Sequence, residues 1–444
     1  MTSHTQPARG TRDFLPADVR RRAYVIDVVR GVYERYGFEP LETPAFEHIE
    51  TLLGKYGDEG NRLIFKILER GEGGASGRAD LALRYDLTVP LARVVAQYQH
   101  DLPRVFKRYQ IQPVWRADRP ARGRFREFYQ CDVDAVGSTS PVVEADILGA
   151  VTDVLVALGF DDFVIRLNHR RVLAALLAVS GVEPGSQAGA LVAIDKLDKI
   201  GPDGVAAELA ARGIGAASAA RLMEAFAAPG DRLAWLEGAL ETSPDGAAAL
   251  GELRRIVHLC QANAAGAHVR VDASLARGLS YYTGAIMEVA VEGIGSLGGG
   301  GRYDGLVGMF LGRDVPACGF SLGLERIIVV MAERGMFPPR IAAGAVDAVV
   351  TFMDEESQAD ALQMASALRA MAHAVDLYPD AGRKIEKPLK YAAARGARAL
   401  IIFGEQERAR GAATVRNLET REQHSVPRAA AAAAVARLLA ASPR

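Results

Sequence analysis

One nonapeptide, Ala276–Gly284 with the sequence ARGLSYYTG, places an arginine and two tyrosines in a short apolar setting. An arginine guanidinium keeps its charge and presents a planar fork of N–H donors, which suits a carboxylate or a phosphate. A tyrosine offers a flat apolar face with a polar tip. This combination predicts a pocket for a small, charged ligand that carries a ring and lies near a phosphate.

A second chemical signal is a basic segment upstream, between Arg104 and Arg126. It holds eight basic residues against one acid, Asp118. The basic residues are Arg104, Lys107, Arg108, Arg116, Arg119, Arg122, Arg124 and Arg126. Such a run is often a solvated face, but here it is interleaved with aromatic residues rather than polar ones. A solvated face and a surface that faces phosphate both remain open.

Two acids, Asp86 and Asp134, lie in strand-like contexts beside Thr88 and Gln130. Their closeness to the basic segment favours a role in the pocket over a surface ion pair. The stretch GIGSLG at Gly293–Gly298 has the GxGxxG spacing of a dinucleotide site, but three more glycines follow where a helix should start. We therefore expect a hairpin or a turn at the rim of a pocket.

Length and composition indicate two or three globular domains in a chain of 444 residues, 49% of them hydrophobic. The net charge of −1 argues against binding nucleic acid through bulk charge. The three cysteines are far apart, the eight histidines show no metal spacing, and no run of 18 apolar residues occurs. These features predict a cytoplasmic protein that does not insert into a membrane.

Hydrophobic periodicity and turn residues predict the elements that must position these residues. In the first part of the chain we expect helices at Pro16–Tyr36 and Ser140–Leu158, and strands at Phe38–Thr43, Leu63–Leu68, Leu81–Tyr85, Arg104–Trp115 and Arg124–Val136. The last two strands form an antiparallel pair around the loop Asp118–Gly123, and a glycine-rich turn covers Gly71–Gly77.

In the second part of the chain the predicted secondary structure changes twice. A helical segment over 169–265 is followed by strands at Val269–Asp272, Ala285–Val291 and Ala317–Ser321, a helix at Leu322–Arg334 and a linker at Gly335–Ala345. A βαβαβ pattern then runs from Val346 to Phe403, and an Ala-rich helix covers Arg428–Ala441. The predicted domains are a core in two parts, 1–168 and 266–334, around the helical insertion 169–265, then an α/β domain at 346–427 and a tail at 428–444.

Three segments resemble the class II aminoacyl-tRNA synthetases. Arg104–Asp134 is similar to motif 2 of that class, Gly319–Arg326 to motif 3, and Ala8–Pro44 occupies the place of motif 1. Five further stretches resemble histidyl-tRNA synthetases: RGTRDFLP at Arg9–Pro16, RYDLT at Arg84–Thr88, EFYQCDVD at Glu127–Asp134, RGLSYYTG at Arg277–Gly284 and GGGRYDGL at Gly299–Leu306. The resemblance implies an α+β fold: an antiparallel catalytic sheet with a helical insertion, and a C-terminal α/β domain of the anticodon-binding type.

The resemblance also implies roles for individual residues. Arg116 and Arg277 would be catalytic, holding the α-phosphate of ATP, with Arg116 also at the histidine carboxylate. Arg124 and Arg326 would bind the ATP phosphates and stack on adenine. The histidine-binding residues would be Asp86, Leu87, Thr88, Gln130, Asp134, Tyr281 and Tyr282, with the ammonium group at Asp86, Thr88 and Gln130 and the imidazole between Asp134 and Tyr282.

The implied activity is activation of L-histidine with ATP to histidyl-adenylate and transfer to tRNA(His), with release of pyrophosphate and AMP. Mg²⁺ is expected with ATP, without assignable protein ligands, and a homodimer is expected from motif 1. The alternative is a histidine-sensing regulatory subunit of ATP phosphoribosyltransferase, which usually lacks the C-terminal domain. Ser280 departs from the family's aspartate in RGLDYYTG, and Asp86 and Asp134 stand where bacterial members often carry glutamate.

Overall fold

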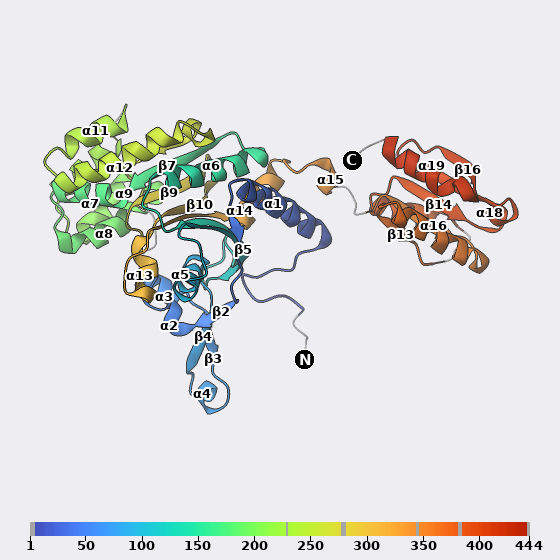
Figure 1. Ribbon diagram of the computed structural model, residues 1–444, viewed down its shortest axis with the longest axis horizontal. Helices are drawn as coiled ribbons and strands as arrows, with labels where there is room; N and C mark the ends of the chain where they lie inside the picture. The colour runs from blue at the N-terminus through green and yellow to red at the C-terminus, as the bar shows by residue number, and fades with distance from the viewer. Residues whose placement is uncertain (1–4, 228–229, 277–280, 343–345, 381–383, 442–444) are drawn as a thin grey trace. The chain divides into compact units, whose positions relative to one another are not determined.

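The computed structural model describes residues 5–227, 230–276, 281–342, 346–380 and 384–441. The chain forms two compact units, Met1–Met336 and Phe337–Arg444 (Figure 1). No helix in these described ranges is long and apolar enough to cross a lipid bilayer.

The first unit is built on a sheet that, among the described residues, has eight strands in the order β1-β5-β6-β11-β10-β9-β7-β8. Its strands are β1 (Glu39–Pro40), β5 (Phe106–Trp115), β6 (Glu127–Val136), β7 (Phe163–His169), β8 (Val269–Val271), β9 (Ala285–Val291), β10 (Gly295–Arg302) and β11 (Ala317–Gly323). Neighbours from β5 to β7 in this order pair antiparallel. The edge strands β1 and β8 are parallel to their neighbours. The antiparallel core of the predicted fold class is confirmed.

Side chains alternate across the sheet, and one face is covered by helices. The covering helices that contact β6 are α1 (Pro16–Arg35), α6 (Val142–Ala157) and α14 (Leu324–Glu333). The buried apolar side chains of α1 are Val25, Val29, Val32 and Tyr33. The buried face also contains Arg22, whose guanidinium lies 2.7 Å from the Glu325 carboxylate on α14. The buried face of α1 is therefore not purely apolar.

A small three-stranded sheet lies between β1 and β5 in the chain and projects from the core strands in Figure 1. Its elements and their neighbours are β2 (Phe46–His48), α2 (Ile49–Leu52), α3 (Gly57–Arg62), β3 (Lys66–Leu68), α4 (Glu72–Ala75), β4 (Ala79–Leu83) and α5 (Thr88–Gln97). The strand expected over Leu63–Leu68 begins only at Lys66, and the expected glycine-rich turn contains the single helical turn α4.

Helices dominate between β7 and β8, as the alanine- and leucine-rich sequence predicts. They are α7 (Arg170–Val179), α8 (Pro184–Ile194), α9 (Leu197–Ala211), α10 (Ala216–Ala227), α11 (Arg232–Ala239), α12 (Pro244–Cys260) and the 3₁₀ turn Ala264–Ala267. α9 is kinked at Gly201, where φ is 70°, because Pro202 follows. Figure 1 shows these helices gathered beside β7 and β9, and α13 (Asp304–Leu311) lies between β10 and β11 in the chain.

In the described part of the second unit, a five-stranded sheet has the order β13-β12-β14-β15-β16, with helices packed on both faces. Its elements are α15 (Pro339–Ala342), β12 (Ala348–Phe352), a 3₁₀ turn Glu355–Ser357, α16 (Gln358–Ala370), β13 (Val375–Leu377), α17 (Glu386–Ala394), β14 (Ala399–Phe403), α18 (Glu405–Ala409), β15 (Ala412–Asn417), β16 (Gln423–Pro427) and α19 (Arg428–Ala441). The predicted parallel strands are present, and β15 and β16 extend the sheet antiparallel. α19 packs Ala431, Val435 and Leu439 into the same core as α16.

Candidate active site

A cleft of about 410 Å³ opens over β6, β10 and β11 in the first unit. Most of the predicted site residues line it: Asp86, Thr88, Arg116, Arg124, Gln130, Asp134, Tyr281, Tyr282 and Arg326. Leu87 does not, because its side chain is fully buried and its carbonyl accepts a hydrogen bond from Arg108. Arg277 and Ser280 lie outside the described residues.

The floor of the cleft is a polar row on β6. Gln130, Asp132 and Asp134 alternate with Cys131 and Val133, so their side chains share one face of the strand. Asp134 lies opposite Gly319 of β11. A Cβ atom at position 319 would lie 1.8 Å from Asp134 Oδ1, so glycine there provides the space that the carboxylate occupies.

Asp134 is buried and held by two groups from different strands. A guanidinium nitrogen of Arg108 on β5 lies 2.9 Å from Asp134 Oδ2. Tyr303, the residue after β10, donates its hydroxyl to Asp134 Oδ1. Burial raises the pKa of the Asp134 carboxyl, and the Arg108 charge opposes that rise. The carboxylate is therefore fixed in orientation at the bottom of the cleft.

Asp86 lies in the loop between β4 and α5, not in a strand as predicted. Its Oδ1 accepts from the Val89 amide at 3.1 Å and from the Tyr56 hydroxyl at 2.9 Å, and its Oδ2 lies 3.5 Å from the Tyr281 hydroxyl. Because the side chain accepts from an amide in the first turn of α5, it fixes the start of that helix. Burial raises the pKa of Asp86.

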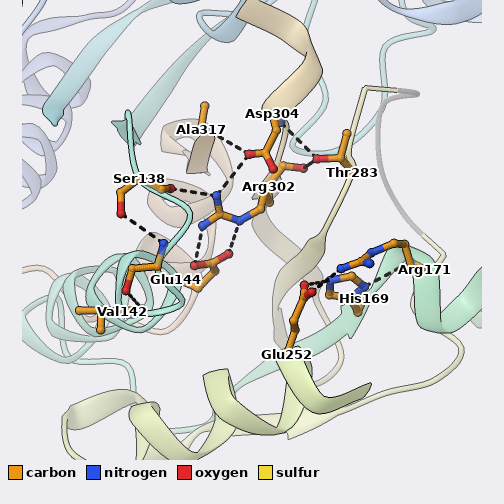
Figure 2. A network of polar contacts seen from close by, with 11 residues as sticks. Ser138, Val142, Glu144, His169, Arg171, Glu252, Thr283, Arg302, Asp304 and Ala317 are labelled. Carbon is orange, nitrogen blue, oxygen red and sulfur yellow. Dashed lines mark hydrogen bonds and ion pairs between the residues drawn. The ribbon is translucent and has the colours of Figure 1, made fainter. Parts of the chain in front are cut away.

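The residue that follows the two tyrosines, Thr283, belongs to a polar network around Arg302 that Figure 2 shows. Tyr281 and Tyr282 meet edge to face, with ring centroids 5.0 Å apart. The next residue, Thr283, donates its amide to the Arg302 carbonyl at 2.8 Å. The Arg302 guanidinium in turn lies 2.6 and 2.9 Å from the two oxygens of buried Glu144 on α6. This ion pair anchors the tyrosine segment to the body of the unit.

Among the residues that the structure describes, three guanidinium groups line the cleft. Arg116 donates to the Tyr85 carbonyl at 3.0 Å and lies over the Tyr85 ring, 4.3 Å from its centroid. Arg326 donates to the Ser296 carbonyl at 2.5 Å, while Arg124 is exposed on the loop between β5 and β6. Such a group of fixed cations suits a polyphosphate.

The basic segment is thus neither a uniform solvated face nor a uniform phosphate surface. Arg116 and Arg124 face the cleft, whereas Lys107 lies 2.7 Å from Asp146 and Arg108 is fully buried. Arg126 donates to the Asp118 carbonyl at 3.1 Å. The alternation of side chains along β5 and the loop between β5 and β6 therefore direct the basic side chains of this segment to different surroundings.

Sequence reasoning missed several residues of the site. Asp132, Arg108 and Tyr303 were not assigned, although the alternation in EFYQCDVD places Asp132 on the same face as Gln130 and Asp134. Asp195 and Lys199, from the helical segment, also line the cleft. Nothing in the local sequence of that segment marks them. The stretch at Gly293–Gly298 forms the predicted hairpin, between β9 and β10.

An antiparallel sheet with a polar cleft beside clustered arginines agrees with the catalytic core of a class II aminoacyl-tRNA synthetase. Residues 10–327 match the family model described as histidyl-tRNA synthetase, and residues 347–438 match that of an anticodon binding domain. The chain belongs to the histidyl-tRNA synthetase family, as its motifs predict.

Relatives with this activity in their names match the chain over nearly its full length. The chain is 43% identical to the histidine–tRNA ligase of Gloeobacter violaceus, over 96% of this chain and 97% of the relative, and 41% identical to that of Cytophaga hutchinsonii, over 94% and 96%. The histidyl-tRNA synthetase structure from Nostoc sp. PCC 7120 is 31% identical, with a TM-score of 0.81 over 98% of this chain and 99% of that one. A Bacillus halodurans structure titled as an ATP phosphoribosyltransferase regulatory subunit/histidyl-tRNA synthetase shares the fold at 22% identity, over 90% of this chain and 98% of that one, with a TM-score of 0.74.

Proposed function

We propose that this protein activates L-histidine with ATP to histidyl-adenylate and transfers the histidyl group to tRNA(His). The observation that carries the proposal is that Asp134 and Tyr282 line the same cleft as Arg116, Arg124 and Arg326. A carboxylate and a phenol that could bind the amino acid lie in the same cleft as cations that could bind a triphosphate, which supports the proposal.

The first step joins two anions. A histidine carboxylate oxygen attacks the α-phosphorus of ATP, and the bond to the oxygen that bridges to the β-phosphate breaks, so pyrophosphate leaves. Fixed guanidinium groups offset the repulsion and stabilise charge on the phosphate oxygens, and no protein nucleophile is required. We assign the α-phosphate to Arg116 and Arg277, and the histidine carboxylate to Arg116. The remaining phosphates and adenine are assigned to Arg124 and Arg326.

Specificity for histidine follows from the imidazole ring, which carries one N–H donor and one acceptor when neutral. Asp134 would accept from one ring nitrogen and the Tyr282 hydroxyl would donate to the other. A site built for such bonds rejects analogues that lack them, since its buried polar groups would be left unpaired. Thr88, Gln130 and the Asp86–Leu87 segment would surround the amino end, with Tyr281 in the adjoining wall.

In the second step a ribose hydroxyl at the end of tRNA(His) attacks the carbonyl carbon of the adenylate, and AMP leaves. The match of residues 347–438 to an anticodon binding domain supports recognition of the tRNA by the second unit. The same match supports this function over the alternative of a histidine-sensing regulatory subunit of ATP phosphoribosyltransferase.

Mg²⁺ is expected to accompany ATP. The described residues contain no group of three metal-ligating side chains, and Glu325 at the cleft is already paired with Arg22. The donor set does not form a protein cage, so the ATP phosphates themselves would bring the ion.

We further propose a cytoplasmic homodimer. The segment around motif 1 exposes three large apolar side chains, Leu15, Val19 and Phe46, at 69%, 49% and 51%. Exposed large apolar side chains favour a protein interface. Sedimentation equilibrium at micromolar concentration should give twice the chain mass, and a monomer throughout would refute the dimer.

Charging of a tRNA(His) transcript with labelled histidine tests the function. The wild-type protein should form acid-precipitable histidyl-tRNA that is sensitive to mild alkali, and Asp134→Asn should raise the KM for histidine with little change in the KM for ATP. Charging of that transcript with another amino acid, or equal changes in both KM values, would contradict the assignment.

A further inference from the structure

The end of β7 is held to the loop after β8 by two side chains that have no role in the account above. Arg166 and Asn168 alternate with Leu167 on β7, so both side chains project from one face of the strand. The loop segment that they contact, Asp272–Leu275, comes directly after β8 and ends two residues before Arg277 in the sequence. Because Arg277 is assigned to the α-phosphate, whatever fixes this segment bears on the reaction.

The face of β7 that carries these side chains is also the face of the sheet that forms the floor of the cleft. Arg166 is directly opposite Glu288 on β9, which is opposite Gly299 on β10. Gly299 is opposite Ser321 on β11, and Ser321 is opposite Asp132 on β6. Residues directly opposite each other in a sheet share one face. One row of residues therefore runs across the sheet from Asp132 in the cleft to Arg166.

Arg166 binds the start of the loop segment through its fork of donors. Its Nε lies 2.5 Å from Asp272 Oδ2, and its Nη2 lies 3.5 Å from the Ser274 hydroxyl oxygen. Asp272 Oδ1 in turn accepts from the Ser274 amide at 2.9 Å and from the Ser274 hydroxyl at 2.6 Å. Only 18% of the Arg166 side chain is exposed, so water competes little for these contacts. The turn is therefore fixed both within itself and to β7.

Asn168 fixes the next part of the loop segment. Its side chain is fully buried, and its amide nitrogen donates to the Ala273 carbonyl at 3.2 Å and to the Leu275 carbonyl at 3.0 Å. Its Oδ1 accepts from the His169 amide at 2.8 Å. Because both amide hydrogens of this asparagine are used on main-chain carbonyls of one segment, the side chain sets the path of that segment.

The Arg166 guanidinium also reaches the helical segment. Its Nη1 lies 2.6 Å from Asp198 in the first turn of α9, and 3.3 Å from buried Glu288. Lys199, which follows Asp198 in the sequence, lines the cleft. The Asp198 side chain is 68% exposed, so water competes for its contact with Arg166. We therefore expect this contact to contribute less than the contacts to the loop segment.

The chain between β8 and β9 thus has an anchor at each end. The downstream anchor is Thr283, whose amide donates to the Arg302 carbonyl. It is adjacent in the sequence to Tyr282, which is assigned to the imidazole ring. The upstream anchor, formed by the two side chains of β7, is nearer in the sequence to Arg277. The two anchors should therefore influence different kinetic parameters.

We propose that Arg166 and Asn168 are positioning residues for the attack of histidine on ATP, because they fix the chain that leads into Arg277. The proposal rests on the proposed function. Misplacing a catalytic group by about 1 Å can cost about 100-fold in rate. The groups that bind the imidazole ring are held elsewhere, so loss of the upstream anchor should lower kcat and leave the KM for histidine nearly unchanged.

The test is histidine-dependent ATP–pyrophosphate exchange. Rates are divided by the concentration of active sites, measured from the burst of ATP consumption in the presence of pyrophosphatase, so that a misfolded fraction does not lower kcat. Arg166→Met and Asn168→Ala should each lower kcat by about 10- to 100-fold and keep the KM for histidine within about threefold. Arg302→Gln, at the downstream anchor, should instead raise that KM.

Two variants serve as matched controls. Arg334→Met removes an ion pair in which both nitrogens of the fork contact Asp162, just before β7, and it should change neither parameter. Asp198→Asn leaves the contacts of Arg166 with the loop segment in place and should keep kcat within about threefold. If Arg166→Met does not fold, Arg166→Lys keeps a positive charge among the carboxylates but lacks the fork, so it should still lower kcat.

Three results would overturn the proposal. The first is an unchanged kcat per active site in folded Arg166→Met and Asn168→Ala. The second is a rise in the KM for histidine in these variants that equals the rise in Arg302→Gln, and the third is a loss of kcat in Asp198→Asn that equals the loss in Arg166→Met. These results leave the proposed function intact, whereas a wild-type protein without histidine-dependent exchange refutes the function and the proposal together.

Discussion

Replacing Arg108 with methionine is the sharpest test of how the floor of the cleft is stabilised. Arg108 is fully buried on β5, 2.9 Å from Asp134, 3.9 Å from Asp132 and 3.2 Å from the Leu87 carbonyl. Methionine keeps much of the side chain's volume and removes its charge. Two carboxylates, each at most 3% exposed at the side chain, then lose the cation closest to them.

The expected loss follows from the burial of that ion pair. Removing one partner of a buried pair costs about 3–5 kcal/mol, because the remaining charge has no compensation. The unfolding entropy of a unit the length of Met1–Met336 is about 0.7 kcal/mol/K, so this loss corresponds to a fall of about 4–7 °C in Tm.

The loss should depend on pH in a defined direction. Burial raises the pKa of Asp132 to about 7 despite the Arg108 charge, and raises that of Asp134 as well. Without Arg108 both pKa values rise further, so the folded variant binds more protons than the unfolded chain and is destabilised as the pH rises. The deficit in Tm relative to the wild-type protein should be largest at pH 8 and shrink towards pH 5.5.

Arg84→Met is the matched control for this pH dependence. Arg84 is equally buried, but its hydrogen bonds go to the carbonyls of Thr43, Pro44 and Pro113 and to the Gln112 side-chain oxygen. Its removal leaves neutral acceptors unpaired, so its deficit should be the same at both pH values. Differential scanning fluorimetry of both variants at pH 8 and 5.5 makes the comparison. An Arg108→Met deficit that is absent, or independent of pH, would refute the reasoning.

Three other predictions concern the surroundings of the site. Gly319→Ala places a methyl group 1.8 Å from the present position of Asp134 Oδ1 and should lower kcat/KM for histidine by about 100-fold in pyrophosphate exchange; unchanged kinetics would contradict the steric argument. Arg302→Gln leaves the buried Glu144 carboxylate without its ion-pair partner, so it should destabilise the protein by about 3–5 kcal/mol and raise the KM for histidine. A urea unfolding midpoint that does not shift would refute the anchoring role of the Arg302–Glu144 ion pair. Burial lowers the pKa of His169 to about 4, so between pH 6.5 and pH 4 the unfolded chain binds a proton that the folded chain does not. The free energy of unfolding should therefore fall towards pH 4 by up to about 3 kcal/mol. His169→Gln should reduce this dependence on pH in urea titrations, and an unchanged dependence would count against the argument.

Sequence reasoning predicted the residues that line the cleft better than the bounds of the strands that carry them. The positions of Asp134 and Gln130 in the cleft were predictable, because the alternation of side chains along β6 and the stretch EFYQCDVD both indicate them. The same alternation predicts Asp132 on that face, but no motif role pointed to it. Arg108 required the cross-strand register, since only the pairing of β5 with β6 sets it opposite Asp134.

The glycine-rich strand β10 could not be predicted from local propensity, because glycine is depleted in strands. The structure supplies the reason: a Cβ at Gly300 would lie 2.1 Å from the Gly319 carbonyl oxygen, and one at Gly301 3.0 Å from the Tyr282 ring. The neighbours approach so closely that only glycine fits. Likewise, Asp195 and Lys199 lie in the cleft because of the way the helical segment packs in three dimensions. No local sequence pattern predicts that packing.

The most direct test of the central claim is amino-acid-dependent ATP–pyrophosphate exchange across the twenty amino acids, with Arg116→Ala measured in parallel. The cleft predicts exchange with histidine alone, strongly reduced in the variant. Exchange with a different amino acid, or histidine binding without any exchange, would contradict the claim that this cleft activates histidine, and the second result would favour a sensor of histidine instead.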